Sequence, residues 1–318
     1  MHFKKGPDYS QQGTSQSKED ITITTRLQIL IAGTLFLVSI GIVSAKPHVS
    51  TCEFLASGSA NSASGPLRLA CTVDGEKREA LVYAPTIGIK GEKLPLVFAF
   101  HGHGGNMQGA SQLMRIQILW PGAIVVYPQG VDRPSPVDPS GNKPGWQLEA
   151  NQALGNVGNK DLHFFDSMLA AMHEKFTVDN QRIYTTGFSN GAGFSYLLWA
   201  ERGQQLAAVG EVAGRLFNPP EHLTQPRAVI AIAGTMDTTD PFARQKATID
   251  NDDRPVDGAT GQGQPCQVPN AATNGTECTL YASTTQTPVK TLIHPGAHVY
   301  PPWAPAEIVA FFKNHKRP

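Results

Sequence analysis

The chain has 318 residues, and 40% of them are hydrophobic and 16% charged, which suits one large globular domain together with a short N-terminal segment. The 26 basic and 26 acidic residues balance, so the composition argues against binding to nucleic acid or to an anionic membrane surface. We find no internal repeat and no Cys-x-x-Cys pair of the kind that holds a metal.

The N-terminus has the features of a targeting segment. Residues 1–26 are polar, and we expect them to be disordered. Residues 27–45 follow Arg26 with an apolar run and end in Val-Ser-Ala, which predicts a secretory signal peptide cleaved after Ala45. Two alternatives stay open: a signal anchor, since the run is at the short limit for a membrane span, and a translation start further downstream. We expect a secreted, extracellular or periplasmic protein that meets a membrane only if the signal is uncleaved.

The four cysteines agree with export, because an even number of cysteines in an exported chain suggests disulfides. Cys52 and Cys71 flank one local segment, and Cys266 and Cys278 flank another. We therefore expect the bonds Cys52–Cys71 and Cys266–Cys278. Four cysteines allow three connectivities, and the sequence alone does not exclude the other two.

Strands alternate with helices along most of the chain. Short, continuous apolar runs, typical of strands that are buried on both faces, occupy residues 94–100, 122–128, 206–213 and 228–233. Helices are predicted at residues 161–176, 194–200 and 304–313. This alternation predicts an α/β fold, with a mostly parallel central sheet and helices on both faces.

The sequence Gly-Phe-Ser-Asn-Gly at residues 187–191 joins a predicted strand to a predicted helix. A strand, a Gly-x-Ser-x-Gly turn and a helix make the nucleophile elbow of α/β-hydrolases. Such an elbow exposes the Ser189 hydroxyl and leaves the backbone N–H of Asn190 at a helix N-terminus, where it meets a developing oxyanion. The pattern arises by chance in roughly one chain in ten of this size, so its partners decide its meaning.

A glycine-rich turn, residues 101–106, follows the apolar strand at 94–100. In α/β-hydrolases this turn supplies a second backbone donor to the oxyanion, and the N–H of His103 is our candidate, with that of Gly104 next. The side chains of His101 and His103 suggest zinc ligands, but no third ligand has suitable spacing nearby.

A nucleophilic serine needs a base and an acid, and in this fold they follow in the order Ser, acid, His. Asp237 stands just beyond the strand at 228–233 and is our acid; Asp240 is a rival whose alternative role is that of a turn residue before a proline. His298, in a loop beyond the strand at 289–293, is our base, and His294 is the alternative.

Four stretches, residues 96–106, 178–192, 234–237 and 296–301, carry a resemblance to a known family. From residue 52 to the C-terminus, the chain resembles the secreted polyhydroxybutyrate depolymerase and feruloyl esterase family of α/β-hydrolases. The resemblance implies Ser189 as nucleophile, Asp237 as acid and His298 as base, with the N–H groups of His103 and Asn190 as the oxyanion hole. With cleavage after Ala45, we expect one α/β-hydrolase catalytic domain over residues 46–318.

The chain departs from the family at two places. Relatives commonly carry Trp-Asn with nearby cysteines where this chain has Trp146-Gln147 in the irregular stretch 129–158, and they usually have Trp where Tyr300 stands. We expect Trp146, Gln147 and Tyr300 to line the substrate cleft; surface padding is the alternative for the stretch around Trp146. The acyl and alcohol specificity is therefore open.

These observations predict a monomeric serine carboxylic-ester hydrolase that needs no metal and no organic cofactor. Its substrate is an ester: a polyester, a feruloylated or acetylated polysaccharide, or a small ester. A peptidase or lipase on the same fold is one alternative, although no long apolar loop suggests a lipase lid. A non-catalytic binding module is the other, and it would be expected to have lost a member of the triad.

Overall fold

The computed structural model of the protein describes residues 50–55, 65–85, 87, 91–217, 223–268 and 275–317. The chain divides into two units, Met1–Lys46 and Pro47–Pro318, and all described residues belong to the second. The expected polar lead (1–26) and signal peptide (27–45) lie outside the described residues.

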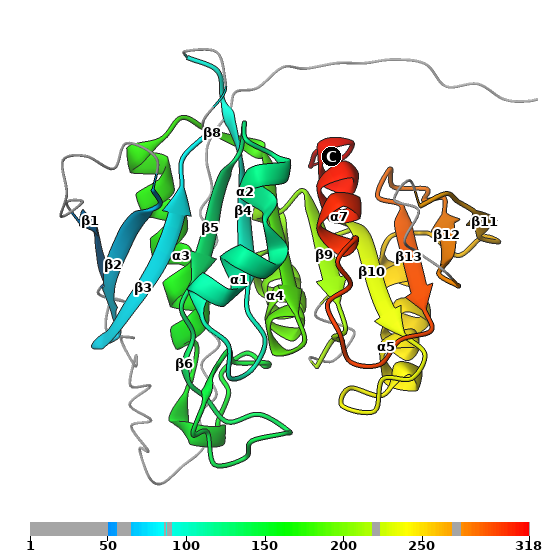
Figure 1. The fold of residues 1–318 in the computed structure, drawn as a ribbon, viewed down its shortest axis with the longest axis horizontal. Coiled ribbons are helices and arrows are strands. Elements are labelled where there is room, and N and C mark those ends of the chain that lie inside the picture. Colours follow the sequence, from blue (N-terminus) through cyan, green and yellow to red (C-terminus); the bar gives the residue numbers. More distant parts are fainter. Residues whose placement is uncertain are drawn as a thin grey trace, which may run out of the picture. The chain divides into compact units, whose positions relative to one another are not determined.

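Within the described part of the chain, one mixed sheet of 11 strands forms the centre of the domain (Figure 1). Its six middle strands, from β5 to β13, pair in parallel, and the strands at both ends are antiparallel. In sheet order the strands are β1 (Ser50–Leu55), β2 (Leu67–Val73), β3 (Glu76–Tyr83), β5 (Ile124–Pro128), β4 (Leu94–Phe100), β8 (Val178–Phe188), β9 (Ala208–Val212), β10 (Ala228–Gly234), β13 (Val289–His294), β12 (Glu277–Tyr281) and β11 (Gln264–Pro265).

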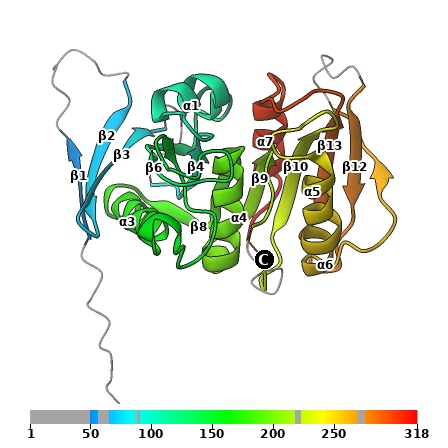
Figure 2. The same cartoon turned by 90° about the horizontal axis from the view of Figure 1, so that it is seen from below.

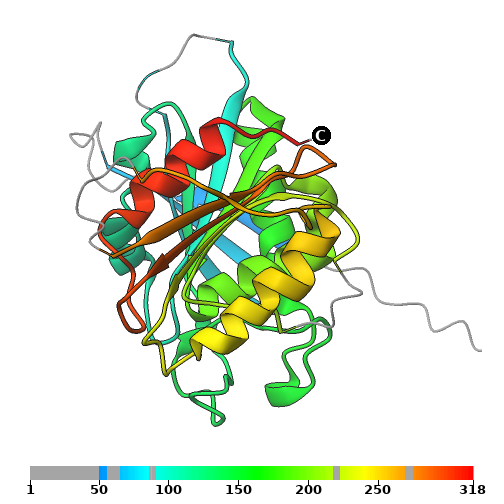
Figure 3. The ribbon, with the colours of Figure 1, turned by 90° about the vertical axis from the view of Figure 1, so that its right-hand side faces the viewer.

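Helices cover both faces of this sheet (Figures 2 and 3). One face carries α1 (Met107–Met114), α2 (Ile116–Leu119) and α7 (Ala304–Lys313). The other carries α3 (Lys160–Lys175), α4 (Asn190–Arg202) and the run α5 (Phe242–Thr248), η4 (Ile249–Asp253) and α6 (Arg254–Val256). None of the described helices is long and apolar enough to cross a membrane.

The helix layers on both faces explain why the middle strands of the sheet have apolar sequences. Along β4, Phe98 and Phe100 belong to the core beneath α3 and α4, and Val97 and Ala99 belong to the core beneath α1 and α7. Because successive side chains of a strand point to opposite faces, a strand covered on both sides is apolar at every position. The predicted fold class, a mostly parallel sheet with helices on both faces, is confirmed.

Two disulfides join neighbouring strands at the two ends of the sheet. Cys52 on β1 is bonded to Cys71 on β2, and Cys266, just after β11, is bonded to Cys278 on β12. Both bonds are local in the sequence, spanning 19 and 12 residues. The described cysteines are therefore all paired, in sequential order.

The irregular stretch 129–158 lies at the end of the sheet where the carboxyl ends of the parallel strands β9, β10 and β13 are found (Figure 1). It contains a small two-stranded sheet of β6 (Val131–Asp132) and β7 (Pro144–Gly145) and the short 3-10 helix η1 (Leu154–Asn156). Since the carboxyl ends of parallel strands gather at one edge, side chains from separate strand ends and from this stretch meet there.

Candidate active site

Ser189 sits in a sharp turn between β8 and α4. Its backbone has φ 55° and ψ −119°, a conformation that is strained for a residue with a side chain. The glycines on either side make the turn possible: a Cβ on Gly187 would overlap the carbonyl group of Gly191, and a Cβ on Gly191 would overlap the carbonyl oxygen of Phe100. The turn therefore has the geometry of a nucleophile elbow.

Ser189, His298 and Asp237 are joined by two hydrogen bonds. The Oγ of Ser189 lies 2.8 Å from Nε2 of His298, and Nδ1 of His298 lies 2.7 Å from Oδ2 of Asp237. These residues come from the elbow, from the loop after β13 and from the loop after β10, so three strand ends bring them together. This is the arrangement in which an imidazole accepts the serine proton while a carboxylate fixes its tautomer.

The environment of the carboxylates distinguishes Asp237 from Asp240. Oδ1 of Asp237 accepts from the N–H groups of Thr239 and Asp240, at 2.9 and 3.0 Å, and Oδ2 accepts from Nε2 of Gln245 at 2.9 Å. Asp240 instead binds Arg215, with Nε to Oδ1 at 3.0 Å, and burial raises the pKa of Asp240. Of the two, only Asp237 is bonded to the histidine.

The alternative base, His294, has another role. Its side chain is 6% exposed, its Nδ1 accepts from the N–H of Gly296 at 3.0 Å, and burial lowers its pKa. It terminates β13 and is bonded to its own loop rather than to Ser189. The structure therefore pairs the serine with His298.

The glycine-rich turn and the first residue of α4 both lie next to Ser189 in the structure. The glycine-rich turn approaches the elbow closely, because a Cβ on Gly102 would be 3.4 Å from Cβ of Ser189. Within this turn, Gly104 N–H donates to the carbonyl of Pro144 at 2.7 Å, which leaves His103 as the donor for a ligand. Asn190 is the first residue of α4, so its N–H has no acceptor within the helix.

The imidazoles of the turn are bound to protein groups. Nε2 of His101 accepts from the N–H of Gly130 at 2.9 Å, and burial lowers the pKa of His101 to about 4, so the ring is neutral. Nε2 of His103 lies 3.0 Å from Oδ2 of Asp138. Among the described residues, no group of three or more His, Cys, Asp or Glu side chains could hold a metal ion.

Comparison with known proteins gives the family. Residues 79–261, more than half of the chain, match the family model described as esterase PHB depolymerase. The chain belongs to this esterase family.

Probable feruloyl esterase C of Aspergillus clavatus is 32% identical over 147 residues, which are 46% of this chain and 50% of that protein. Its counterpart in Aspergillus niger is 26% identical over 211 residues, 64% of this chain and 69% of that protein. The chain thus spans about half the length of the first of these relatives.

Solved structures show the fold of this PHB depolymerase family member. The acetyl xylan esterase from Aspergillus awamori superposes with a TM-score of 0.57 at 15% identity, covering 83% of this chain and 99% of that one. The acetyl xylan esterase from Paenibacillus sp. R4 gives a TM-score of 0.56 at 13% identity, covering 85% and 90%. Together with the sheet order and the elbow, these likenesses confirm the α/β-hydrolase fold.

Three predicted substrate contacts in this family member are wrong, because the side chains are buried. Trp146 is 0% exposed, donates from Nε1 to the carbonyl of His101 at 2.9 Å and stacks on Phe194. Gln147 is also 0% exposed and accepts from the N–H of Asp161 at 2.9 Å. Tyr300 is 8% exposed, its hydroxyl is buried, and its ring packs edge-to-face with that of Phe188. None of the three is among the residues that line the hollows beside Ser189.

Other residues line the cleft of this family member. Two hollows open beside Ser189, one of about 70 Å³ and one of about 720 Å³. Their walls include Val137, Leu148, Arg215 and Phe217, which no motif in the sequence marks. No periodic pattern marks these positions, since they belong to irregular segments, and only their place after strand ends links them to the site.

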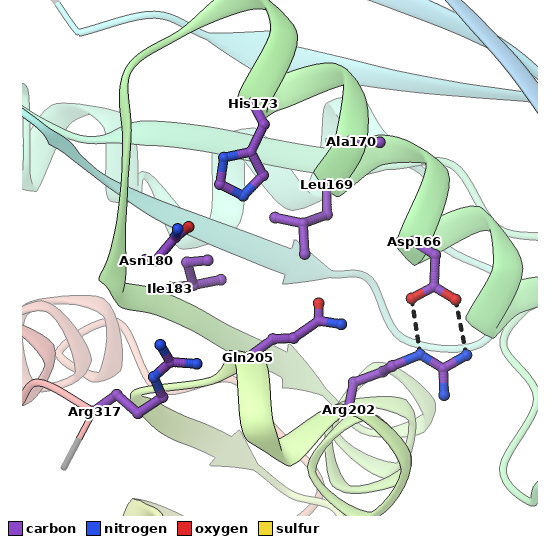
Figure 4. A pocket seen from close by; sticks show the side chains of 9 residues that line it. All are labelled: Asp166, Leu169, Ala170, His173, Asn180, Ile183, Arg202, Gln205 and Arg317. Carbon is purple, nitrogen blue, oxygen red and sulfur yellow. Dashed lines mark hydrogen bonds and ion pairs between the residues drawn. The ribbon is translucent and has the colours of Figure 1, made fainter.

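A further hollow, of about 620 Å³, lies away from the elbow, between α3, the start of β8 and η2 (Gly203–Gln205) (Figure 4). Arg202 binds Asp166 there through two hydrogen bonds of 2.8 Å, and His173 and Arg317 stand at its rim (Figure 4). Its lining residues include no serine, threonine or cysteine beside a base. The chemistry of acyl transfer therefore points to the cleft at Ser189.

Proposed function

We propose that the protein is an exported serine esterase that hydrolyses carboxylic esters by an acyl-enzyme mechanism. The observation that carries this proposal is the pair of hydrogen bonds from Ser189 through His298 to Asp237, at 2.8 and 2.7 Å. Membership of the PHB depolymerase family supports ester hydrolysis over peptide hydrolysis or binding alone. The catalytic domain comprises residues 46–318.

In the first step, Oγ of Ser189 attacks the ester carbonyl and transfers its proton to Nε2 of His298. Asp237 stabilises the resulting imidazolium through Nδ1. The N–H groups of His103 and Asn190 donate to the oxyanion of the tetrahedral intermediate. When the bond from the carbonyl carbon to the alcohol oxygen breaks, His298 returns the proton to the departing alcohol.

The second step releases the acid. A water molecule loses a proton to His298 and attacks the acyl carbon, and the proton then returns to Oγ of Ser189 as the acyl bond breaks. Every proton is accepted and returned by this one imidazole. The sequence of steps needs no metal and no organic cofactor.

The names of relatives suggest the class of ester. They are feruloyl esterases and acetyl xylan esterases, so we propose that the ester joins an acid to a plant cell-wall polysaccharide, with polyester as the other candidate. The protein would act outside the cytoplasm, which agrees with two disulfides. N-terminal sequencing of the exported protein tests the predicted signal peptide. Cleavage after Ala45 makes Lys46 the first residue, whereas a protein that retains residues 27–45 contradicts the cleavage.

The decisive test is the variant Ser189→Ala, with Ser140→Ala, an exposed serine of the stretch 129–158, as the matched control. Hydrolysis of p-nitrophenyl acetate and butyrate should fall to background in Ser189→Ala and persist in Ser140→Ala. An organophosphonate should add covalently to Ser189 in the native protein, as measured by peptide mass spectrometry. Unchanged turnover in Ser189→Ala would sink the proposal.

A further inference from the structure

Two hollows of very different size meet at the nucleophile. The smaller, of about 70 Å³, and the larger, of about 720 Å³, share the same four lining residues: Ser189, His103, Val137 and Thr239. On this measure one water molecule needs about 10–15 Å³, so the smaller hollow has room for a group of only a few heavy atoms. The larger falls in the range of about 300–1,000 Å³ that is usual for whole ligands.

The position of His298 indicates which hollow would bind the acyl part of an ester and which would bind the alcohol part. His298 lines the larger hollow and is not among the residues lining the smaller one, which instead includes Asn190. Because the imidazole must hand its proton to the departing alcohol, the alcohol lies on the side of His298. The acyl chain therefore points into the smaller hollow.

The end of the smaller hollow is a packed wall. Leu148 is 6% exposed, and its N–H donates to Oε1 of Gln152 at 2.8 Å. Leu148 and Phe217 both press on α4 at Gly193, where an added Cβ would be 2.6 Å from Cδ2 of Leu148 and 3.3 Å from the ring of Phe217. Leu148 therefore has little room to retreat from an incoming acyl chain, and α4 blocks the partly buried ring of Phe217 on one side.

An ion pair holds the ring of Phe217 in place. The guanidinium carbon of Arg215 lies 3.7 Å from the centre of that ring, and Nε of Arg215 donates to Asp240 at 3.0 Å. The backbone of Asp240 is in turn bonded to Asp237, the acid of the triad. The wall is therefore anchored to the same loop as the catalytic carboxylate.

We propose that the wall formed by Leu148 and Phe217 restricts the enzyme to short acyl groups, of about two to four carbons, while the open side accepts bulky alcohols such as a sugar hydroxyl. This inference rests on the proposed esterase function and deepens it. Hydroxycinnamoyl and long fatty acyl groups would be poor substrates, in contrast to what the names of several relatives suggest.

The test keeps the alcohol constant and varies the acyl chain. The ratio of kcat/KM for p-nitrophenyl acetate to that for p-nitrophenyl octanoate should exceed 10-fold, and methyl ferulate should be hydrolysed more slowly than methyl acetate, because each excess methylene meets a closed wall. Leu148→Ala and Phe217→Ala should each lower the acetate-to-octanoate ratio by about 10-fold or more. Leu113→Ala, on an exposed part of α1, is the matched control and should leave the ratio unchanged.

Failure of this inference can be told apart from failure of the esterase proposal. If no ester is hydrolysed, the esterase proposal fails. If acetate is hydrolysed but octanoate or ferulate is preferred, the esterase stands and the short-acyl inference is overturned. A ratio that stays the same in both Leu148→Ala and Phe217→Ala also overturns the assignment of the wall. Since the ratio is internal to each variant, a partial loss of folded protein does not affect it.

Discussion

Asn190 and Trp146 exchange two hydrogen bonds across the base of the cleft. The N–H of Trp146 donates to Oδ1 of Asn190 at 2.7 Å, and Nδ2 of Asn190 donates to the carbonyl of Trp146 at 3.0 Å. Between them, Gly145 fits tightly: a Cβ there would be 2.6 Å from Nδ1 of His103 and 3.0 Å from Oδ1 of Asn190. The segment 144–146 thus lies against both His103 and Asn190, the residues proposed to donate to the oxyanion.

This contact predicts that Asn190→Ala lowers kcat by roughly 10- to 100-fold, because small displacements of a catalytic donor are costly. KM should change little, since substrate binding is not the property removed. Steady-state kinetics with p-nitrophenyl acetate measure both, with Asn314→Ala near the C-terminus as control. An equal rise in KM with kcat intact would show that the side chain binds substrate instead.

The elbow predicts a strong effect of a single methyl group. Gly187→Ala places its Cβ against the carbonyl group of Gly191, where backbone rather than a flexible side chain must move. We expect a loss of about 3 kcal/mol or more in the free energy of unfolding, or no folded protein. Thermal unfolding measures it, and Gly261→Ala, whose Cβ would meet nothing within 4 Å, is the control. Equal melting temperatures would contradict the close approach.

The two neighbouring aspartates should differ sharply in their effect on catalysis. Asp237→Asn removes the carboxylate that holds His298, and we expect kcat to fall by about 10⁴-fold. Asp240→Asn breaks the ion pair with Arg215, and its loss of kcat should be at least about 100-fold smaller. Kinetics on p-nitrophenyl acetate decide between them. A larger loss in Asp240→Asn would reverse the assignment.

Stability should depend on pH through Glu211. This residue of β9 is 1% exposed, and neither of its carboxylate oxygens has a hydrogen-bond partner among the described residues. Burial, then the charge of Asp253, raise its pKa well above 4.5. The folded state keeps a proton that the unfolded chain loses, so this stability is full below about pH 4.5 and declines as pH rises toward the folded-state pKa.

For one such carboxyl the decline is about 1.4 kcal/mol per pH unit in that window. Glu211→Gln should remove this slope, and the variant should be more stable than the native protein at pH 8. Urea unfolding at several pH values measures the effect. The exposed Glu174→Gln on α3 is the control. A native and a Glu211→Gln protein with the same pH slope would show that Glu211 is ionised in the fold.

The fold class, and the three residues that hydrogen bonds bring together at the elbow, could be predicted from the sequence for physical reasons. Strands covered on both faces are apolar throughout, as in β4 and β10, and this is visible without any structure. Asp237 and His298, which hydrogen bonds join to Ser189, could be predicted because this fold places catalytic residues just beyond strand ends, in a known order.

The cleft could not be predicted in the same way. The direction of a side chain in an irregular loop follows from tertiary packing rather than from a period, so the burial of Trp146 and the wall at Phe217 left no trace in the sequence. The prediction that Tyr300 lines the cleft was wrong for the same reason, because Tyr300 also lies in an irregular loop. The burial of the Glu211 carboxyl group was not predicted either, although the residue lies within a predicted apolar strand.

The positions of the two disulfides have a consequence for solubility. The outermost strands of a sheet expose unpaired backbone groups, to which another chain can add a strand. Here Cys52 ties the outermost strand β1 to β2, and Cys266–Cys278 ties the opposite margin to β12, while Pro265 removes a backbone donor from β11. A covalent bond therefore opposes the separation of the outermost strands from the sheet at both ends. In a reducing environment, these margins would become the first places where one copy of the protein could adhere to another.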